Sequence, residues 1–456
     1  MSLSSRWKRQ SHFRRHVIVN LLLGLAIDGL IHRFHHTPIV QRAENAGLDA
    51  VIAFFGARGS DGDAEQGIAY TVLDVDDATW AGWGSPNLTP RKNLVTLLDA
   101  ATAAGAAAIL VDLDLTRKEG ENGLSAGAGD RALDSFLTNY RGRVPIVLPR
   151  LLRAPPDMDS IRHWPAPLPA WFERETPFVG PIYWGTVQFV EEIDGVVRRW
   201  RLWEPVCSGG RPGVLPSVQL LAATLVDTGA SIGALRAELD ALAPAACDSA
   251  WLRHGEVRAF GHVIEPSEEE IPERIIYSLR WPPDSGPTRM VRLADGSTVP
   301  VLLRIPAGLA SDTSQPIDAR LLAGRVVVVG ASDADSRDWY ATPMGRMPGM
   351  MLIVNSIESL RRYGQYGKSP GVLRWLVVGG LLILTSVAYA RYHPMVATLL
   401  ITPLIYLAVL PLSFYVFTSG AWLDFTAPVL GVQLHELIAS AEDAWKNRGR
   451  RFPEHE

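Results

Sequence analysis

Long apolar runs mark the C-terminal part of the chain. Residues Met395 to Phe417 contain no charged side chain, and a helix of that length crosses a hydrocarbon core of about 30 Å. Val372 to Ala390 is nearly as long, and its one charge, Arg374, lies near one end of the run. We therefore predict transmembrane helices over 372–390 and 395–417, separated by a short polar segment that makes them an antiparallel hairpin.

A weaker apolar segment lies near the N-terminus. Val17 to Ile31 is short for a membrane span and includes Asn20 and Asp28, but several basic residues precede it. The positive-inside rule then places the N-terminus in the cytoplasm and predicts a first transmembrane helix over 17–35. A cleaved signal peptide is the alternative interpretation, although no small-x-small cleavage site clearly follows.

The last apolar segment, 421–440, carries ionisable residues and admits two interpretations. If it crosses the membrane as a fourth helix, the basic tail 441–456 joins the basic N-terminus 1–16 in the cytoplasm, as the positive-inside rule favours. If it does not cross, it is an amphipathic helix lying on the outer membrane surface. In the first arrangement, which we prefer, the large region 36–371 is extracytoplasmic.

Strand and helix patterns alternate within that large region. Ile68 to Asp77 and Ala106 to Leu115 are apolar runs that close in acidic residues, and the segment between them repeats apolar residues at helical spacing. This order indicates a βαβ unit, and unbroken apolar strands favour a parallel sheet covered on both faces. The runs "RVPIVLPR" and "GRVVVVGA" predict further strands, and 185–203 predicts a hairpin. The predicted fold class is α/β, a mixed or parallel sheet covered by helices, with a transmembrane helix bundle.

Composition and charge narrow the function classes. The formal net charge of -4 gives no general basic field, so nucleic acid is not indicated as a partner. Cys207 and Cys247 are too few for a disulfide framework or a four-ligand zinc site. They either form a single bridge in an oxidising compartment or remain two buried thiols.

Acidic residues follow several predicted strands and are the candidate ligand-binding groups, namely Asp74, Asp76, Asp112 and Asp338. Ligands of open α/β sheets bind at the carboxyl ends of the strands, where carboxylates hold a hard cation or a cationic ligand. The alternative is that these residues cap the helices and turns that follow them. Arg91, near the start of the next predicted helix, either pairs with one of these acids or holds an anionic ligand.

A series of motifs runs along the chain in a characteristic order. It comprises "VLDVDDATW", "WGSPNLTPR" before a helix, "AAAILVDLDL", "GDRALDSFL", "IDGVVRRWRL", and last "GRVVVVGASDADSRDWYATPM" with "MPGMMLIVNSIESL". In this order the chain resembles the second type of CHASE domain, an extracytoplasmic sensory module, over about residues 50–363. The resemblance also implies one N-terminal transmembrane helix and usually three C-terminal ones.

The resemblance assigns several residues to family motifs. The strand-end aspartate of the family matches Asp74 or Asp76, and its Trp-Pro-x-x-Arg element matches Arg91 loosely because "WGSPNLTPR" is stretched. The remaining matches are the hairpin residues Asp194, Gly195, Val196 and Arg198, and the late-motif residues Gly330, Asp338, Thr342, Pro343, Pro348, Gly349 and Asn355.

Two functions follow from these observations. The first, which we favour, is a sensor in the cell membrane that binds an unidentified ligand or detects a physical cue. The second is an extracytoplasmic metal-dependent enzyme that uses the strand-end aspartates. No nucleophile and base pair, and no HExxH or similar spacing, supports an enzyme, so we expect no catalytic residues, cofactor or bound metal.

Signalling is expected to involve a separate protein. Members of the family usually continue into an output domain, whereas only about 16 residues follow the last apolar segment here, and a domain needs upwards of about 50. His435 and Glu436 lie in the predicted last helix and are candidate docking residues, since ionisable groups inside a membrane usually face protein. The expected partners are therefore membrane lipid, an effector protein and a small ligand or envelope cue, with a homo-oligomer also compatible with the sequence.

Overall fold

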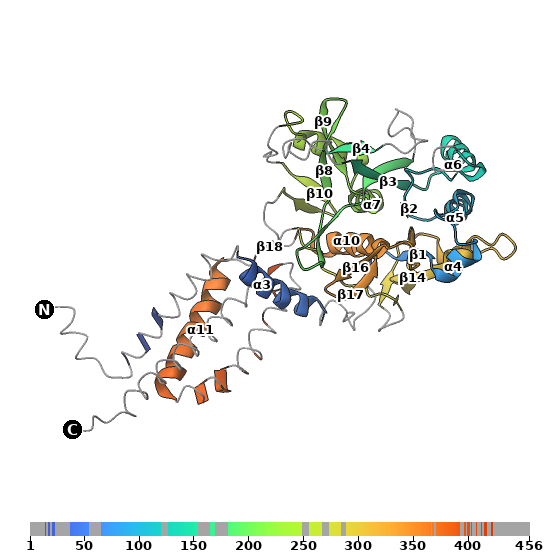
Figure 1. Cartoon of the computed structure of the whole chain (residues 1–456). Helices are drawn as coiled ribbons and strands as arrows, with labels where there is room; N and C mark the ends of the chain where they lie inside the picture. The colour runs from blue at the N-terminus through green and yellow to red at the C-terminus, as the bar shows by residue number, and fades with distance from the viewer. Residues whose placement is uncertain are drawn as a thin grey trace, which may run out of the picture. The chain divides into compact units, whose positions relative to one another are not determined.

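The computed structural model describes most of the region predicted to be extracytoplasmic (Figure 1). The described residues are 14, 17–18, 21–22, 37–53, 65–119, 126–153, 165–168, 181–248, 255–266, 273–283, 289–365, 367–368, 371–392 and a few positions between 396 and 422. The chain divides into two compact units, one formed by residues 1–51 with 366–456 and the other by residues 52–365. We call the second the α/β unit.

A seven-stranded sheet organises the α/β unit, in the order β14-β1-β15-β2-β3-β4, with β5 also paired to β3. The strands are β1 (Tyr70–Val75), β2 (Ala108–Asp112), β3 (Ile146–Arg153), β4 (Ala166–Leu168), β5 (Ile182–Thr186), β14 (Leu302–Pro306) and β15 (Val326–Ala331). All pairings are parallel except that of β4 with β3. The predicted α/β class is thereby confirmed, with a mixed sheet because of β4.

The two faces of the sheet are covered by different helices. Side chains alternate along a strand, so Leu73 and Val75 of β1 join a core that also receives apolar residues of α5 (Arg91–Ala103), α6 (Ala128–Asn139) and α9 (Ala307–Ala310). The opposite face packs against α7 (Val218–Val226) and α10 (Gly349–Tyr363). Figure 1 shows α5 beside α6 on one side and α10 with α7 on the other.

Local sequence explains where these helices begin and end. α5 follows Pro90 directly, and the Ser217 hydroxyl accepts from the amide of Leu220 at 3.2 Å to cap α7. α10 begins after Pro348 and ends at Tyr363, and the residue that follows it, Gly364, has a φ of +60°, which favours glycine. Short α4 (Asp77–Gly82), α8 (Ile232–Leu242) and a 3-10 turn (Ala319–Leu321) complete the helices described in this unit.

Two-stranded hairpins extend from the main sheet. They are β6 (Phe189–Glu191) with β7 (Val197–Trp200), β8 (Trp203–Ser208) with β9 (Arg211–Pro216), β10 (Val257–Ala259) with β11 (His262–Ile264), β12 (Met290–Arg292) with β13 (Thr298–Pro300), and β16 (Trp339–Thr342) with β17 (Gly345–Pro348). Cys207 of β8 forms a disulfide with Cys247, which follows α8. Of the two alternatives that the sequence left open for these cysteines, the structure has the bridge.

The other unit contains α3 (Pro38–Val51), α11 (Gly371–Arg391) and a short pairing of β18 (Gly367–Lys368) with β19 (Ala421–Trp422). α11 occupies the segment predicted as the span 372–390. Among the helices that the structure describes, none combines the length and apolar character required to cross a bilayer. The predicted spans 17–35, 395–417 and 421–440 lie largely outside the described residues, as does the tail 441–456.

Candidate functional site

Asp74 and Asp76, at the carboxyl end of β1, are both paired with Arg304 of β14. The Arg304 Nε lies 2.6 Å from the Asp74 Oδ2, and its Nη2 lies 2.9 Å from the Asp76 Oδ2. Burial raises the pKa of Asp74, while hydrogen bonds from Ser332 and Arg304 oppose that rise. Asp76 also caps α4 by accepting from the Thr79 amide at 2.9 Å. Both acids therefore have partners within the protein. Asp76 has the capping role that was the alternative to ligand binding.

Arg91 is fully buried at the start of α5 and does not pair with a strand-end aspartate side chain. Its guanidinium donates to the carbonyl of Arg117 at 3.1 Å and to that of Asp114, and it lies 4.0 Å from the Asp130 carboxylate. Burial lowers its pKa, and the acid Asp130 counters this most strongly, followed by Glu119. Arg91 therefore ties the loop after β2 to α5 and α6, rather than facing a ligand.

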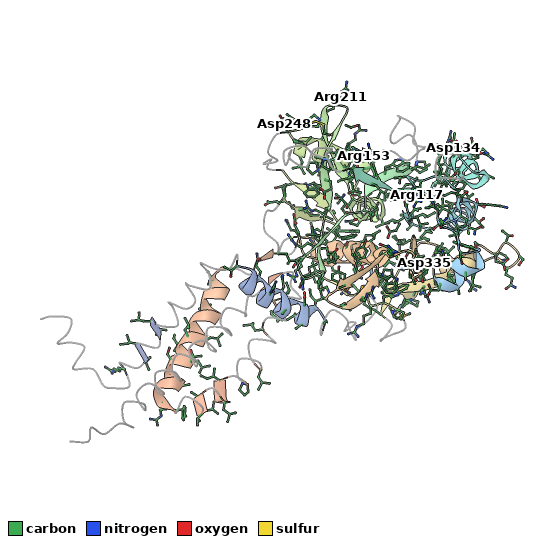
Figure 2. All side chains as sticks on the ribbon, viewed as in Figure 1. Arg117, Asp134, Arg153, Arg211, Asp248 and Asp335 are labelled. Atoms are coloured by element: carbon green, nitrogen blue, oxygen red, sulfur yellow. A yellow bond between two sulfur atoms is a disulfide. The ribbon has the colours of Figure 1, made fainter. Side chains whose placement is uncertain are left out.

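Asp112 and Asp338, by contrast, line the same cavity at the carboxyl edge of the sheet. The cavity has a volume of about 660 Å³, within the range of small-molecule sites. Its walls are formed by Val75, Trp80, Trp83, Pro86, Asn87, Leu88, Thr89, Asp112, Leu113, Asp114, Pro149, Leu151, Val187, Ala331, Asp333, Asp335, Ser336, Asp338 and Tyr340. Asp335 is labelled in Figure 2, and the neighbouring Ala334 amide donates to Asp77 of α4 at 2.9 Å. This is the position at which open α/β sheets bind ligands.

The two cavity aspartates influence each other electrostatically. Burial raises the pKa of Asp112 well above its usual range, and the nearby charge of Asp338 raises it further. Burial likewise raises the pKa of Asp338, against hydrogen bonds from the Tyr340 hydroxyl and the Gly349 amide. The Asp112 Oδ2 is buried and has no hydrogen-bond partner in the described part of the chain. A carboxyl group in this position is protonated more readily than one in water.

The cavity is directly connected to the first residue of α10. Asp338 immediately precedes β16, and the β16–β17 hairpin leads into Gly349. The Gly349 amide donates to the Asp338 carbonyl at 3.0 Å, and a Cβ placed on Gly349 would lie only 2.4 Å from the Asp338 Oδ2. The Asp338 carboxylate therefore packs closely on the Gly349 Cα, and a larger residue at 349 would displace it.

The remaining family-motif residues have structural contacts. Asp194 and Arg198 form a two-point ion pair across the β6–β7 hairpin, with oxygen to nitrogen distances of 2.9 and 2.7 Å, and Gly195 in its turn has a φ of +76°. This pair lowers the pKa of Asp194. The Thr342 hydroxyl donates to the carbonyl of Gly345 at 2.6 Å in the β16–β17 turn, which also contains Pro343.

Two further motif residues fix α10 to its surroundings. Gly330 of β15 allows α10 to approach the sheet, since a Cβ there would lie 2.8 Å from the Met350 Cβ. Asn355 is fully buried and accepts from the amides of Ser278 and Leu279, each at 2.9 Å. Pro348, before the first residue of α10, occupies its N-cap position. These positions therefore set where α10 lies.

Sequence reasoning placed four aspartates at one edge but did not separate them into two pairs. Within the described residues, no group of three or more His, Cys, Asp and Glu side chains is arranged to hold a metal ion.

The partner Arg304 was not foreseen, because nothing in its local sequence distinguishes it. Trp80 and Trp83 were also missed as lining residues, although their position just after the strand-end acids was a usable signal. His435 and Glu436 lie outside the described residues.

Comparison with known proteins identifies the family. No curated protein and no solved structure matches the chain. The family model described as the CHASE2 domain, which is a sensory domain, matches residues 21–390. Because this match covers most of the sequence, the chain belongs to the CHASE2 domain family.

Proposed function

We propose that this protein is a membrane-anchored sensor whose α/β unit lies outside the cytoplasm, binds a small ligand at the carboxyl edge of its sheet and signals to a separate effector protein. The observation that carries the proposal is the cavity lined by Asp112, Asp338 and Tyr340. The cavity has the size of a ligand site. Its lining residue Asp338 is joined to the start of α10 both through the chain and by a hydrogen bond from the Gly349 amide.

The route from the cavity to the membrane runs through α10. A ligand that contacts Asp338 or Tyr340 acts on the β16–β17 hairpin, which continues into Gly349. α10 ends at Tyr363, and the chain then reaches α11 at Gly371. A small displacement of the hairpin is thereby passed along one helix toward the C-terminal part of the chain, which contains the proposed anchor, Met395 to Phe417.

The compartment and the anchor are supported by separate observations. The disulfide between Cys207 and Cys247 is of the kind that persists in oxidising compartments such as the periplasm. The anchor is supported by the sequence, in which the uncharged run Met395 to Phe417 has the length of a membrane span. We therefore propose an inner-membrane location with both termini cytoplasmic.

Topology and partner recovery test this proposal. In intact cells, an impermeant thiol reagent should label a cysteine introduced beside Asp194 and should not label one introduced at residue 450. The full chain should recover an effector protein when it is gently solubilised, and Glu436→Leu or deletion of 441–456 should weaken recovery without affecting membrane insertion. Recovery of self-assembled chain alone, together with unchanged signalling after the deletion, would contradict the proposal.

A further inference from the structure

The charged side chains that line the cavity all have the same sign. Five aspartates contribute to its walls, Asp112, Asp114, Asp333, Asp335 and Asp338, and the described lining residues include no Lys, Arg or His. Arg150 of β3 is not one of the lining residues, and its guanidinium lies 5.6 Å from the Trp184 ring centroid. The cavity therefore disfavours an anionic ligand.

These acids differ in the hydrogen bonds that their carboxylates already accept within the protein. The Asp114 carboxylate accepts from the amide and hydroxyl of Thr116, at 2.8 and 2.6 Å. The Asp333 carboxylate accepts from the amides of Asp335 and Ser336, at 3.1 and 2.9 Å. Asp112 is different, because its buried Oδ2 has no partner among the described residues. A buried, unsatisfied carboxyl oxygen at a cavity wall is a position that a donor from a ligand would satisfy.

Another part of the cavity lining is aromatic and apolar. Trp80 and Trp83 of the α4 region line it together with Pro86 and Leu88. The Trp80 Nε1 donates to the carbonyl of Pro86 at 3.1 Å, which fixes the orientation of its indole ring. Indole faces attract cations and pack against flat apolar groups. A bare divalent metal ion needs neither this wall nor a cavity of about 660 Å³.

We propose that the cavity binds a small organic cation, an amine with a compact apolar body, whose ammonium group is held by Asp112 and Asp338 while its body packs against Trp80 and Trp83. This assignment rests on the proposed sensor function and names the class of ligand for the same cavity. An ammonium group donates hydrogen bonds to both carboxylates and supplies the positive charge that the described lining residues lack. Within the described residues, no group of three or more His, Cys, Asp and Glu side chains is placed to hold a metal ion instead.

Binding of such a cation is linked to release of a proton. In the empty cavity, burial and the charge of Asp338 raise the pKa of Asp112, whereas a bound ammonium favours its ionised form. Two further ionisable groups belong to this surrounding, Tyr340 and Glu191. Burial and then the charge of Asp338 raise the pKa of Tyr340, and the charge of Glu191 raises it further. Because the raised pKa falls on binding, affinity should increase with pH until Asp112 is ionised in the empty protein as well.

The test uses the full chain in nanodiscs of zwitterionic lipid, with the primary amines 2-phenylethylamine and cyclohexylamine as probes. Neutral 2-phenylethanol, anionic 3-phenylpropionate and calcium chloride serve as comparison ligands. We expect an amine to raise the thermal midpoint and to bind in calorimetry, with several-fold tighter binding at pH 8 than at pH 6 and with measurable proton release. The alcohol and the carboxylate should bind at least tenfold more weakly.

A matched pair of variants distinguishes binding at the cavity from a general effect of removing one negative charge. Asp112→Asn should weaken amine binding at least tenfold and remove most of its pH dependence, without loss of fold, because the amide has the same shape and no charge to bury. Asp134→Asn on α6, labelled in Figure 2 and outside the cavity lining, should leave binding unchanged.

The outcomes distinguish this inference from the proposed function. If neither amine binds, if alcohol and amine bind equally, or if both variants behave alike, the ligand class is wrong even where effector recovery succeeds. Binding of calcium in preference to the amines would also overturn it, in favour of a metal site. Amine binding without a recoverable effector would instead support the ligand assignment and contradict the sensor mechanism.

Discussion

The first prediction concerns Glu358, a buried carboxylate surrounded by arginines on α10. Its side chain is completely buried, and it forms ion pairs with Arg361 and Arg362 at 3.0 Å each and a close pair with Arg289. The Tyr70 hydroxyl of β1 also donates to it at 3.3 Å. The carboxylate therefore joins α10 to the central sheet and to the segment before β12.

We predict that Glu358→Gln destabilises the α/β unit by about 3 kcal/mol. Removing one partner of a buried ion pair costs about 3–5 kcal/mol. The lower end applies because glutamine keeps the shape and some hydrogen bonds, and because the arginine side chains retain 11–23% exposure and regain water. The matched control is Asp240→Asn, whose ion pair with Arg236 is 64–71% exposed and should contribute less than about 1 kcal/mol.

The assay is urea unfolding of the full chain in a mild detergent, followed by fluorescence of the buried Trp184 and Trp200. Burial alone would raise the pKa of Glu358, but the attraction of Arg289, Arg361 and Arg362 outweighs it and leaves the pKa below its ordinary value. A lowered folded-state pKa contributes stability above the ordinary pKa, about 4.3. That contribution is lost as pH falls through the folded-state value.

The wild type should therefore lose more stability than Glu358→Gln on acidification below about pH 4.3, so the difference between them should shrink. Two results would refute the reasoning. One is a free energy of unfolding for Glu358→Gln within about 0.5 kcal/mol of wild type at pH 7, and the other is a loss no larger than that of the Asp240→Asn control.

Three further predictions concern the scaffold around the cavity. Replacing Cys207 and Cys247 with serine should lower the free energy of unfolding by about 2–4 kcal/mol, because the bridge spans 40 residues of sequence; wild type in reductant should match the double variant in urea unfolding, and no change in either would contradict the prediction. Asn355→Leu leaves two buried amides without an acceptor and should cost about 3 kcal/mol or more, whereas a cost below about 1 kcal/mol in the same assay would show that the amides find other partners. Gly330→Ala places a Cβ 2.8 Å from the Met350 Cβ and should cost about 1–3 kcal/mol; an unchanged thermal midpoint would show that α10 moves aside freely.

The alternation of strands and helices was predictable because it depends on local hydrophobic pattern. β1, α5 and β2 lie where the sequence placed a strand, a helix and a strand, since each segment carries its own period. The position of β15 between β1 and β2 was not predictable, because its partners are more than 200 residues earlier in the chain. Pairing over such a distance leaves no mark in the local pattern.

The candidate site shows the same division. The strand-end position of Asp74 and Asp112 follows from where each apolar run stops, and both are in register with Gly330 of β15. The charge state of each acid depends on distant residues. Arg304 forms an ion pair with Asp74, whereas burial and then the charge of Asp338 raise the pKa of Asp112. The sequence therefore identified the edge of the sheet but did not distinguish the acid paired with arginine from the acid that lines the cavity.

The polar groups buried on α10 limit how a signal can pass along it. The Asn355 side chain accepts from the Ser278 and Leu279 amides, and the Ser359 hydroxyl accepts from the Ile276 amide at 3.0 Å. Sliding α10 past this segment would leave buried amides without acceptors, at a cost of about 1–3 kcal/mol each. Within the proposed sensor, a ligand that displaces Asp338 must therefore move α10 and the segment 276–279 together. Loss of the Asn355 contacts should then weaken transmission to residue 363 while leaving ligand binding at the cavity intact, because the cavity lining does not include Asn355.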